Sequence, residues 1–357
     1  MEPSRRCEIR PIVPVADSGA DAPANAEFRD LVRVRNAVEA HTLGMSSLSQ
    51  TVEELLPRLT DDPHRWYHHV GAWVAGELVG RGLLILPRAE GSMAARGVVD
   101  VLPEHRGAGI GTALLAELEG LAAGEGRHVL QVDVAHGTRS GAEQLASPTG
   151  FGHVPADDPG ARFLVRHGYR LEQVLRVSRY DLGDPGHDAA PREPDDDFTL
   201  HAWVGATPPQ WCDDLAVLKT AMSTATPSGD LTVTETVWTA DDVRDRDARQ
   251  VRRGRTLLTV VAEHRPTGRL VGLTEIEVPA DDRPAFQEDT LVLPGHRGHG
   301  LGIRLKRRNL RELGRHAPAT TTLLTFNAEE NRPMLAVNEA LGYRAIAHEG
   351  PWEKRRE

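Results

Sequence analysis

A nine-residue segment occurs twice in this chain, 191 residues apart. It reads PEHRGAGIG at Pro103–Gly111 and PGHRGHGLG at Pro294–Gly302, with six of the nine positions identical. The chain has 357 residues, more than the roughly 250–300 residues at which one hydrophobic core stops growing. We therefore predict two domains that share one fold and arose by duplication.

The boundary between the two copies is predicted from composition. The segment Asp181–Asp197, DLGDPGHDAAPREPDDD, is acidic and rich in proline and glycine, and it has no apolar face to bury. We interpret residues 181–197 as a linker. The predicted domains are then residues 1–180 and residues 198–357.

The same order of helices and strands is predicted on both sides of this linker. In the first copy a strand over Val98–Leu102 stops at Pro103, and a helix with leucines at helical spacing follows from Gly109. In the second copy a strand over Thr290–Leu293 stops at Pro294, and a similar helix follows. A hairpin precedes each of these strands. This alternation predicts an α/β fold for each copy.

The charge balance and the cysteine content argue against several classes of function. The chain carries a formal charge of −10, and a nucleic-acid partner would require a basic face. The two cysteines, Cys7 and Cys212, lie far apart and fit no disulfide or metal spacing. We see neither a signal peptide nor an apolar run long enough to span a membrane. We expect a cytoplasmic protein that binds neither nucleic acid nor membrane.

Each nine-residue repeat joins a strand to a helix through Arg-Gly-X-Gly-X-Gly. Glycines let the backbone approach a ligand closely, and a helix N-terminus presents unpaired N–H groups and the positive end of its dipole. Such a segment suits a phosphate or pyrophosphate. No Gly-Lys-Ser/Thr follows, so it is not a Walker loop, and its alternate glycines do not fit the Gly-X-Gly-X-X-Gly of dinucleotide-binding folds.

The segments VVDVLPEHRGAGIGTALL and TLVLPGHRGHGLGIRLK resemble the acetyl-CoA-binding motif of the GNAT superfamily of N-acetyltransferases. The order of elements in both halves is similar to that of the family, so the resemblance covers nearly the whole chain. It implies two tandem domains, each a mixed, largely antiparallel twisted sheet flanked by helices. It also implies an N-acetyltransferase with acetyl-CoA as acyl-donor substrate, in which an amine attacks directly in a ternary complex. We expect no metal, because the adjacent His68 and His69 of a predicted strand point to opposite faces. Tandem members of this kind occur in actinobacteria.

The resemblance also implies which residues hold the coenzyme. The strand before each proline supplies backbone hydrogen bonds to the pantetheine arm, and the loop with the helix start holds the pyrophosphate. The strand residues are Val99, Asp100 and Val101 in the first copy, and Thr290, Leu291 and Val292 in the second. The loop residues are Arg106, Gly107, Ala108, Gly109, Ile110, Gly111 and Thr112 in the first copy, and Arg297, Gly298, His299, Gly300, Leu301, Gly302 and Ile303 in the second.

A second signature of the family, Asn-X-X-Ala-X-X-Leu-Tyr-X-X-X-Gly-Phe, follows the next strand. In the second copy Asn331, Gly342 and Tyr343 match it, and Asn331 is expected to bind the coenzyme. Asn338 stands where the family often has a tyrosine that protonates the leaving thiolate. Asparagine does not act as an acid in the way tyrosine does. Tyr343 or water is therefore the alternative proton donor, and Asn338 is kept as a hydrogen-bond partner of the coenzyme.

The first copy departs further from this signature. Counting back from Gly168 places Asp157 at the asparagine position and Leu164 at the tyrosine position. A carboxylate is unfavourable beside an anionic coenzyme, because like charges repel. We therefore predict that catalysis takes place in the second copy.

A protonated amine must lose a proton before it attacks, so the reaction needs a general base. Strand alternation puts Glu288 on the same face as Thr290 and Val292, which makes Glu288 the first candidate. The further candidates are Glu275 and Glu277 on the neighbouring strand, and His136 in the first copy.

Three functions remain open from the sequence. The first is acetyl transfer to the amine of a small molecule by a monomer or homodimer. The second is a catalytically degenerate acetyl-CoA-binding sensor or scaffold, which Asn338, Asp157 and Leu164 favour. The third is acetylation of a protein or peptide amine, which needs an open groove for the longer substrate.

Overall fold

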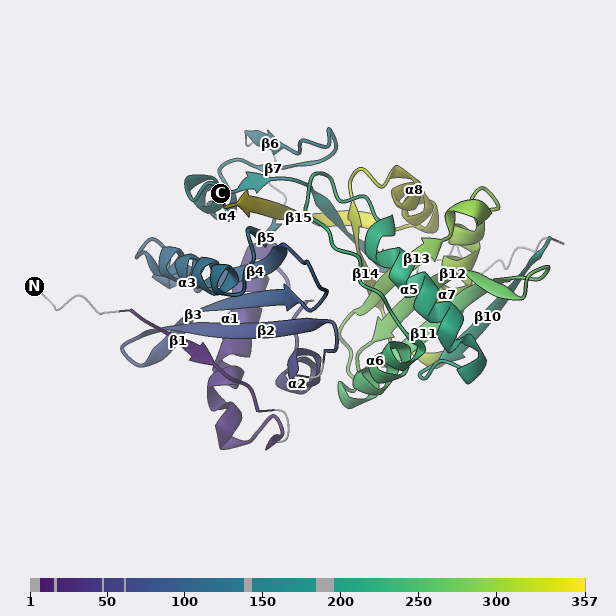
Figure 1. Cartoon of the computed structure of the whole chain (residues 1–357), viewed down its shortest axis with the longest axis horizontal. Coiled ribbons are helices and arrows are strands. Elements are labelled where there is room, and N and C mark those ends of the chain that lie inside the picture. Colours follow the sequence, from purple (N-terminus) through teal and green to yellow (C-terminus); the bar gives the residue numbers. More distant parts are fainter. Residues whose placement is uncertain are drawn as a thin grey trace, which may run out of the picture. The chain divides into compact units, whose positions relative to one another are not determined.

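The computed structural model describes residues 7–15, 18–46, 48–60, 62–137, 143–183 and 196–356. They divide into two compact units. Unit 1 comprises Met1–Leu175, Ser228–Thr234 and Ala347–Glu357, and unit 2 comprises Arg176–Pro227 and Glu235–Ile346. Most of the predicted linker lies outside the described residues. Each unit is a mixed, largely antiparallel sheet flanked by helices, which confirms the predicted fold class (Figure 1).

The sheet of unit 1 has the strand order β1-β2-β3-β4-β5-β15. The strands are β1 (Glu8–Ile12), β2 (Arg65–Val74), β3 (Glu77–Pro87), β4 (Ala94–Val101), β5 (Val129–His136) and β15 (Arg344–Arg355). Neighbouring strands are antiparallel, except that β4 and β5 run parallel. Three short strands complete the unit: β8 (Arg170–Leu171), which pairs with β15, and the hairpin of β6 (Gln144–Ala146) and β7 (His153–Pro155).

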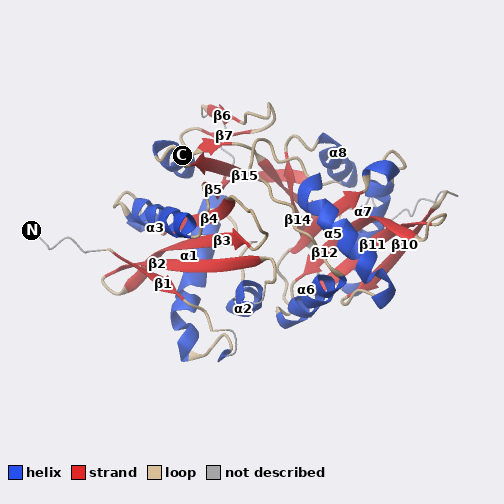
Figure 2. Cartoon of the chain, in the orientation of Figure 1, coloured by secondary structure: helices blue, strands red, loops and turns tan. Residues whose placement is uncertain are grey.

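Helices cover both faces of this sheet (Figure 2). They are α1 (Ala26–Leu43), α2 (Val52–Thr60), α3 (Ile110–Gly124) and α4 (Pro159–Arg166). Helix α3 packs closely on one face, because a Cβ added to Gly80 would lie 3.1 Å from a methyl carbon of Leu114. Helix α1 covers the other face, where Phe28 meets His69 edge to face with ring centroids 5.5 Å apart.

The last strand of the chain completes the sheet of unit 1. Residues His348–Arg355 of β15 pair with β5, and Trp352 is fully buried in the apolar core of this unit. The segment Ser228–Thr234 also belongs here, since Thr232 N donates to Glu353 Oε2 at 2.8 Å. The compact units therefore include segments from both halves of the sequence.

The sheet of unit 2 has the strand order β9-β14-β13-β12-β11-β10. The strands are β9 (Leu175–Asp181), β14 (Thr322–Ala328), β13 (Ala285–Val292), β12 (Arg269–Val278), β11 (Thr256–His264) and β10 (Phe198–Val204). The helices are α5 (Cys212–Ala225), α6 (Ala240–Arg252), α7 (Leu301–His316) and α8 (Arg332–Leu341). Helix α7 packs on one face, where a Cβ on Gly272 would lie 3.2 Å from Leu305. On the other face Leu215 of α5 packs with Leu273 and Leu291.

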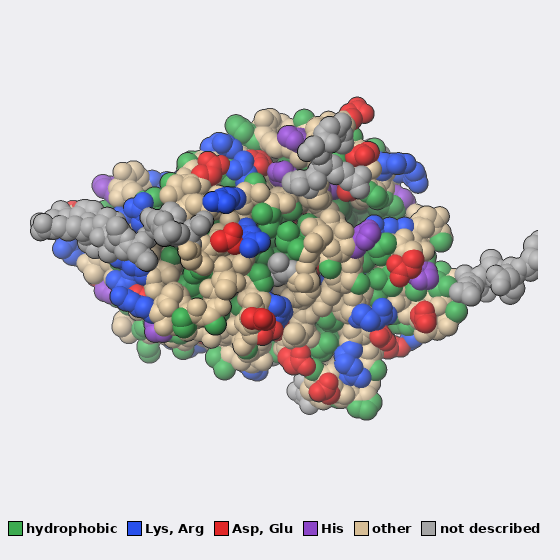
Figure 3. All heavy atoms as spheres, turned by 180° about the vertical axis from the view of Figure 1, so that it is seen from behind, with side chains coloured by type: hydrophobic (Ala, Val, Ile, Leu, Met, Phe, Trp, Pro, Cys, Tyr) green, Lys and Arg blue, Asp and Glu red, His purple; other side chains and the backbone are tan. Residues whose placement is uncertain are grey.

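No helix in the described part of the chain is both long and apolar enough to cross a membrane. On the face shown in Figure 3, the basic and acidic side chains of the described residues are interspersed. This face therefore does not present the uniformly basic surface that a nucleic-acid backbone selects.

Candidate active site

The two repeats form the same local structure in each unit: a strand end, a short 3-10 turn and a helix start. We call residues 102–112 cradle 1 and residues 293–303 cradle 2. The Nε of Arg106 donates to Val101 O at 3.0 Å, and the Nε of Arg297 donates to Val292 O at 3.1 Å. One guanidinium nitrogen of each arginine therefore holds the turn itself, and the remaining N–H groups are left to face a ligand.

Backbone geometry explains the glycines of both cradles. Gly107, Gly109, Gly298 and Gly300 have φ of +80°, +81°, +86° and +68°, a region that side chains other than glycine rarely adopt. A Cβ at any of these four positions would meet no atom within 4 Å, so the space beside each cradle is open. Gly109 and Gly300 cap α3 and α7, and no side chain caps either helix. First-turn N–H groups are thus available, and both cradles fit the pyrophosphate of a coenzyme.

The strand that leads into each cradle separates from its parallel neighbour. The described pairing of β4 with β5 ends at Gly97 and Val132, and that of β13 with β14 ends at Phe286 and Leu324. Beyond these pairs each strand exposes backbone groups to the space between the strands. The strand residues that the sequence assigns to the pantetheine arm lie on these diverging ends: Val99, Asp100 and Val101 in unit 1, and Thr290, Leu291 and Val292 in unit 2.

Strand β13 contains a β-bulge that β4 lacks. The register between β12 and β13 shifts between Thr274 and Ile276, so that Glu288 and Asp289 together face one residue of β12, Glu275. Strand β4 pairs with β3 in an unbroken register. Bulges redirect backbone and side chains and are frequent beside active sites. The two units therefore differ at the point where a coenzyme's acyl group is expected.

The bulge corrects the predicted alternation of β13. Thr290 Oγ1 lies 2.8 Å from Thr274 Oγ1, and Gln287 Nε2 donates to the same Thr274 oxygen at 3.0 Å. Gln287 and Thr290 therefore share a face although they are three residues apart, because the bulge adds a residue between them. Glu288 lies on the bulge with an exposed side chain, and it does not belong to a regular row with Thr290.

The N-termini of α4 and α8 show which residues of the two copies correspond. Asn331 caps α8, and its side-chain oxygen accepts from Met334 N at 3.4 Å. In unit 1 the cap of α4 is Asp158, which accepts from Gly160 N at 2.8 Å. The counterpart of Asn331 is therefore Asp158 and not the predicted Asp157, because the segment from the cap to the terminal glycine is one residue shorter in the first copy, Asp158 to Gly168, than in the second, Asn331 to Gly342. The side-chain amide nitrogen of Asn331 is left free of the cap.

His136, the candidate base of unit 1, is fully buried beside the same aspartate. Its Nδ1 lies 3.0 Å from Asp158 Oδ1. Burial opposes the ionisation of Asp158, but the hydrogen bond and charge of His136 outweigh it and lower the pKa of Asp158. This pair holds the N-terminus of α4 against β5.

Phe163 of α4 and His167, the residue that follows this helix, cover part of cradle 1. A Cβ on Gly111 would lie 3.4 Å from the ring of Phe163. Thr112 Oγ1 lies 3.1 Å from His167 Nε2, and the rings of Phe163 and His167 pack with centroids 4.3 Å apart. In cradle 2 a Cβ on Gly302 would meet nothing within 4 Å. Cradle 2 is therefore open at a point where cradle 1 is covered.

The residues of the second signature lie together in unit 2. Asn338 is 1% exposed and donates from Nδ2 to Asn327 Oδ1 at 2.7 Å, while its own Oδ1 is buried with no partner among the described residues. Leu164 of α4 is fully buried in the core of unit 1. Tyr343 is buried against Tyr180, and burial raises the pKa of Tyr343 above its usual range. Because Oδ1 of Asn338 has no partner among the described residues, this oxygen can accept a hydrogen bond from a ligand.

Glu275 lies inside a buried network of ion pairs. It is 0% exposed, it contacts Lys219 Nζ, and its Oε1 lies 2.6 Å from Arg246 Nη2. Glu277 is bound in the same way by Arg253 at 3.1 Å and Arg255 at 3.2 Å. The carboxylates of Glu275 and Glu277 are thus already ion-paired with lysine and arginine side chains, beneath α5 and α6. Of the three glutamates considered as bases, Glu288 is the one with an exposed side chain.

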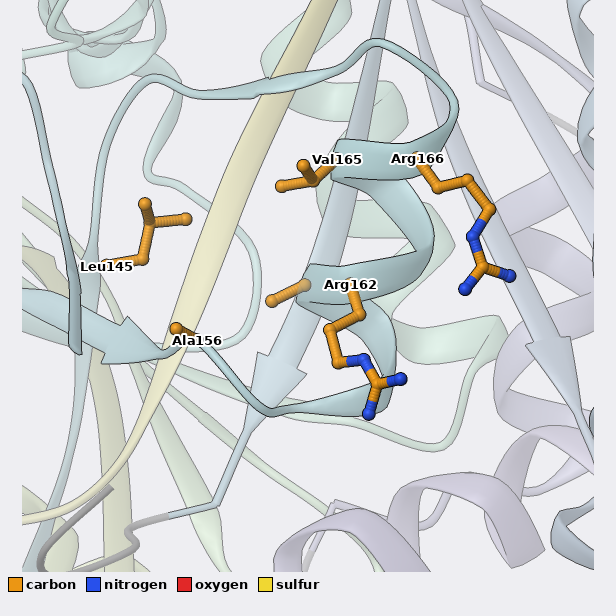
Figure 4. Close-up of a pocket in the computed structure, with 6 residues that line it drawn as sticks. Leu145, Ala156, Arg162, Val165 and Arg166 are labelled. Atoms are coloured by element: carbon orange, nitrogen blue, oxygen red, sulfur yellow. The ribbon is translucent and has the colours of Figure 1, made fainter. Parts of the chain in front are cut away.

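An open groove of about 360 Å³ lies along α4 in unit 1 (Figure 4). It is lined by Leu145, Ala156, Ala161, Arg162, Val165 and Arg166. Val165 points towards Leu145, while Arg162 and Arg166 project from the same side of the helix, one turn apart. None of the residues that line this groove belongs to cradle 1.

Comparison with known proteins finds similarity to GNAT acetyltransferases. Residues 37–151 match the model of the Acetyltransferase (GNAT) family. A tandem GNAT protein from the clavulanic acid biosynthesis pathway, solved without acetyl-CoA, is 27% identical, with 98% of each chain covered and a TM-score of 0.75. A GCN5-related N-acetyltransferase from Sphaerobacter thermophilus is similar in fold, with 17% identity, coverage of 99% of this chain and 96% of that chain, and a TM-score of 0.65. No curated protein matches the sequence.

Proposed function

We propose that this chain, which is similar to tandem GNAT proteins, transfers the acetyl group of acetyl-CoA to the amine of a small molecule, with catalysis in unit 2. One observation carries the choice of unit. The glycine at the second helical position is open in cradle 2, at Gly302, and covered by Phe163 in cradle 1, at Gly111. The bulge of β13 supports the same choice, because β4 has none.

The residues of unit 2 fit the coenzyme by their chemistry. The N–H groups at the start of α7 suit the pyrophosphate, and the diverging end of β13 offers backbone groups to the pantetheine arm. The buried, unpartnered Oδ1 of Asn338 is an acceptor for an N–H or S–H of the coenzyme. When bound, the coenzyme supplies an activated acetyl thioester.

In this proposal Glu288 removes the proton from the incoming amine. Its exposed carboxylate is on the bulge, in the middle of the strand proposed to receive the thioester. Next to the bulge, β13 has separated from β14, so backbone N–H groups of β13 on that side are available to a ligand. These N–H groups polarise the thioester carbonyl by donating hydrogen bonds to its oxygen. The amine nitrogen then attacks, and the thiolate leaves and is protonated by water, because the hydroxyl of Tyr343 is buried and hard to ionise.

We infer the charge of the substrate and the compartment from composition. The net charge of −10 suits a cationic amine. Both cysteines are free thiols, which fits a reducing compartment such as the cytoplasm.

The direct test is release of free thiol from acetyl-CoA by the full chain with a panel of small amines, followed by mass spectrometry of the products. We expect thiol release that depends on the amine and an acceptor heavier by one acetyl group. Tight binding of acetyl-CoA without turnover of any amine would instead support a sensor or scaffold, the alternative that Asn338 favours.

A further inference from the structure

The sheet of unit 1 carries charged side chains on the face beneath α1. Gly82 and Gly97 point towards Leu118 of α3, so the neighbours of these glycines in β3 and β4 point to the opposite face. Strand pairing continues that face through β5 to β15, the last strand of the chain. We call six charged residues of this region, five on the face and one on α1, the charged cluster: Glu39, Arg81, Arg96, Asp100, Asp133 and Glu349.

The fold does not require charges at all of these positions. In the register of β3 and β4, Arg81 lies opposite Asp100. In unit 2 the matching pair is Leu273 and Leu291, since Leu291 stands 191 residues after Asp100. Both leucines pack with Leu215 of α5 in an apolar core. The ion pair at these positions is therefore a feature of unit 1 that needs another explanation.

The charged cluster is short of one positive charge. Three of its four carboxylates lie beside an arginine side chain: Asp100 beside Arg81 at 2.6 Å, Asp133 beside Arg96 at 2.9 Å and Glu39 beside Arg35 at 2.8 Å. The fourth, Glu349, has no hydrogen bond or ion pair with any residue that the structure describes. Four carboxylates and three guanidinium groups leave one negative charge without a partner, and it belongs to Glu349.

Glu353 shows how a carboxylate on the same strand and the same face is satisfied. It accepts from Thr232 N at 2.8 Å and from Gln131 Nε2 at 2.9 Å. Burial opposes its ionisation, but these hydrogen bonds outweigh burial and lower the pKa of Glu353. The strand can therefore provide partners for a carboxylate, and Glu349 lies where the described residues provide none.

The surroundings of Glu349 are unfavourable for its negative charge and open to solvent. Burial and the charge of Asp133 raise the pKa of Glu349 to about 7, although Arg96 opposes this shift. The side chain of Arg96 is 50% exposed, even though β4 lies between β3 and β5 in the middle of the sheet. A ligand can therefore reach this part of the face from solvent.

We propose that Glu349 binds the cationic head group of a small molecule, an ammonium or a guanidinium, on this face of unit 1. Such a group supplies the positive charge that the cluster lacks, and its N–H groups donate to the carboxylate. The charges of Asp133 and Glu39 act at the same point and add to the attraction. The binding needs no coenzyme and is separate from the reaction proposed for unit 2. A residue from the last strand of the chain thus completes a site in unit 1.

Calorimetry on the full chain without coenzyme tests this proposal. The probes are n-butylamine and n-butylguanidine, with n-butanol as the uncharged counterpart. At pH 8 Glu349 is ionised and both cations keep their charge. The test variant is Glu349→Gln, and the control is Glu77→Gln, which changes an exposed glutamate at the start of β3. Glu288→Gln reports on the amine site proposed for unit 2.

We expect wild type, Glu77→Gln and Glu288→Gln to bind at least one of the two cations, and the tighter of the two identifies the head group. Butanol should not bind. Glu349→Gln should weaken binding by about tenfold or more, the effect of one charge-assisted hydrogen bond. Its Tm should not fall, because the carboxylate that is removed has no counter-charge.

Three results would overturn the proposal. The first is that neither cation binds, and the second is that Glu349→Gln binds them as tightly as wild type. The third is a lower Tm of Glu349→Gln, which would mean that its carboxylate already has a counter-charge within the protein. Loss of binding in Glu288→Gln alone would place the amine in unit 2, which supports the proposed function and contradicts this site. Failure of the proposed function shows separately, as absence of thiol release from acetyl-CoA.

Discussion

The hydroxyl of Thr112 lies 3.1 Å from Nε2 of His167. The other ring nitrogen of His167 lies 2.8 Å from the carbonyl oxygen of Phe163, which can only accept, so Nδ1 carries the proton and Nε2 accepts from the threonine. Both nitrogens are thus used to hold the ring over the start of α3. This contact lies at the start of α3, within cradle 1.

Removing the ring is expected to open cradle 1. The variant His167→Ala should raise the number of coenzyme A molecules bound per chain from one to two, because the glycines of cradle 1 already have the open conformation. Calorimetry measures this stoichiometry. Arg166→Ala, an exposed change on the same helix, is the control and should leave it at one. An unchanged stoichiometry in His167→Ala would show that cradle 1 is closed for another reason.

Matched glycine substitutions assign catalysis to a unit. Gly302→Val fills cradle 2 without strain, since an added Cβ meets nothing within 4 Å, and it should lower kcat/KM by about 100-fold through misplaced coenzyme. Gly111→Val makes an ordinary contact with Phe163 and should leave the rate unchanged. Thiol-release kinetics compare the two variants. The opposite ranking would place catalysis in unit 1.

The two glutamates that face each other across the bulge are expected to respond differently. Glu288→Gln should lower kcat by about 10²–10⁴-fold with no change in Tm, because a general base has been removed from an exposed position. Glu275→Gln should lower stability by about 3–5 kcal/mol, because it removes the buried carboxylate that pairs with both Lys219 and Arg246, although Lys219 keeps its ion pair with Asp289. Kinetics and thermal unfolding are measured on both. A stable but inactive Glu275→Gln protein would reverse these roles.

A substitution at Trp352 tests whether the stability of unit 1 depends on the C-terminal strand β15. Trp352→Ala is expected to destabilise unit 1 by about 3–5 kcal/mol, the usual cost of truncating a fully buried aromatic side chain. Calorimetric unfolding shows the effect as a lower Tm of one transition. Trp66→Ala is the control, since Trp66 is 46% exposed. Equal effects from the two changes would mean that β15 is not part of the core of unit 1.

The sequence predicts the local structure of the cradles well. A strand that ends at a proline, glycines that adopt positive φ, and a helix that starts uncapped all follow from residue chemistry within nine positions. The two copies of this segment must adopt the same backbone geometry and therefore share the same glycines. This shared pattern is why the repeat predicts two domains of one fold.

Features that depend on distant partners could not be predicted in this way. The pattern of β15 shows a strand but not that His348–Arg355 pairs with β5, since many strands can offer that partner. The bulge at Glu288 and Asp289 leaves no signal in the alternation of a single strand. The pair Phe163 and His167 could have been noticed only by comparing α4 with α8, where Val337 and Leu341 stand at the same distances from the terminal glycine.

Lys306 is another residue whose role appears only in the structure, and it makes stability depend on pH. It is 1% exposed in α7, has no ion pair among the described residues, and its Nζ lies 5.5 Å from the ring centroid of Tyr343. Burial lowers the pKa of Lys306 to about 7. Lys354 has the same relation to Tyr169, at 5.4 Å, but it is paired with Glu119 at 2.9 Å and is less buried.

The sign of the effect follows from proton binding. Between pH 7 and 10 the unfolded chain keeps the proton of Lys306 while the folded protein has released it, so the unfolded state binds more protons and stability rises with pH. Below pH 7 both states are charged, and the folded state bears the full cost of the buried ammonium. Lys306→Met should therefore raise the free energy of unfolding by roughly 2–4 kcal/mol at pH 6 and by little at pH 10. Lys354→Met should show no such gain. Denaturant unfolding at both pH values measures the difference, and a gain of equal size at pH 6 and pH 10 would mean that packing, and not the charge of Lys306, limits the stability of unit 2.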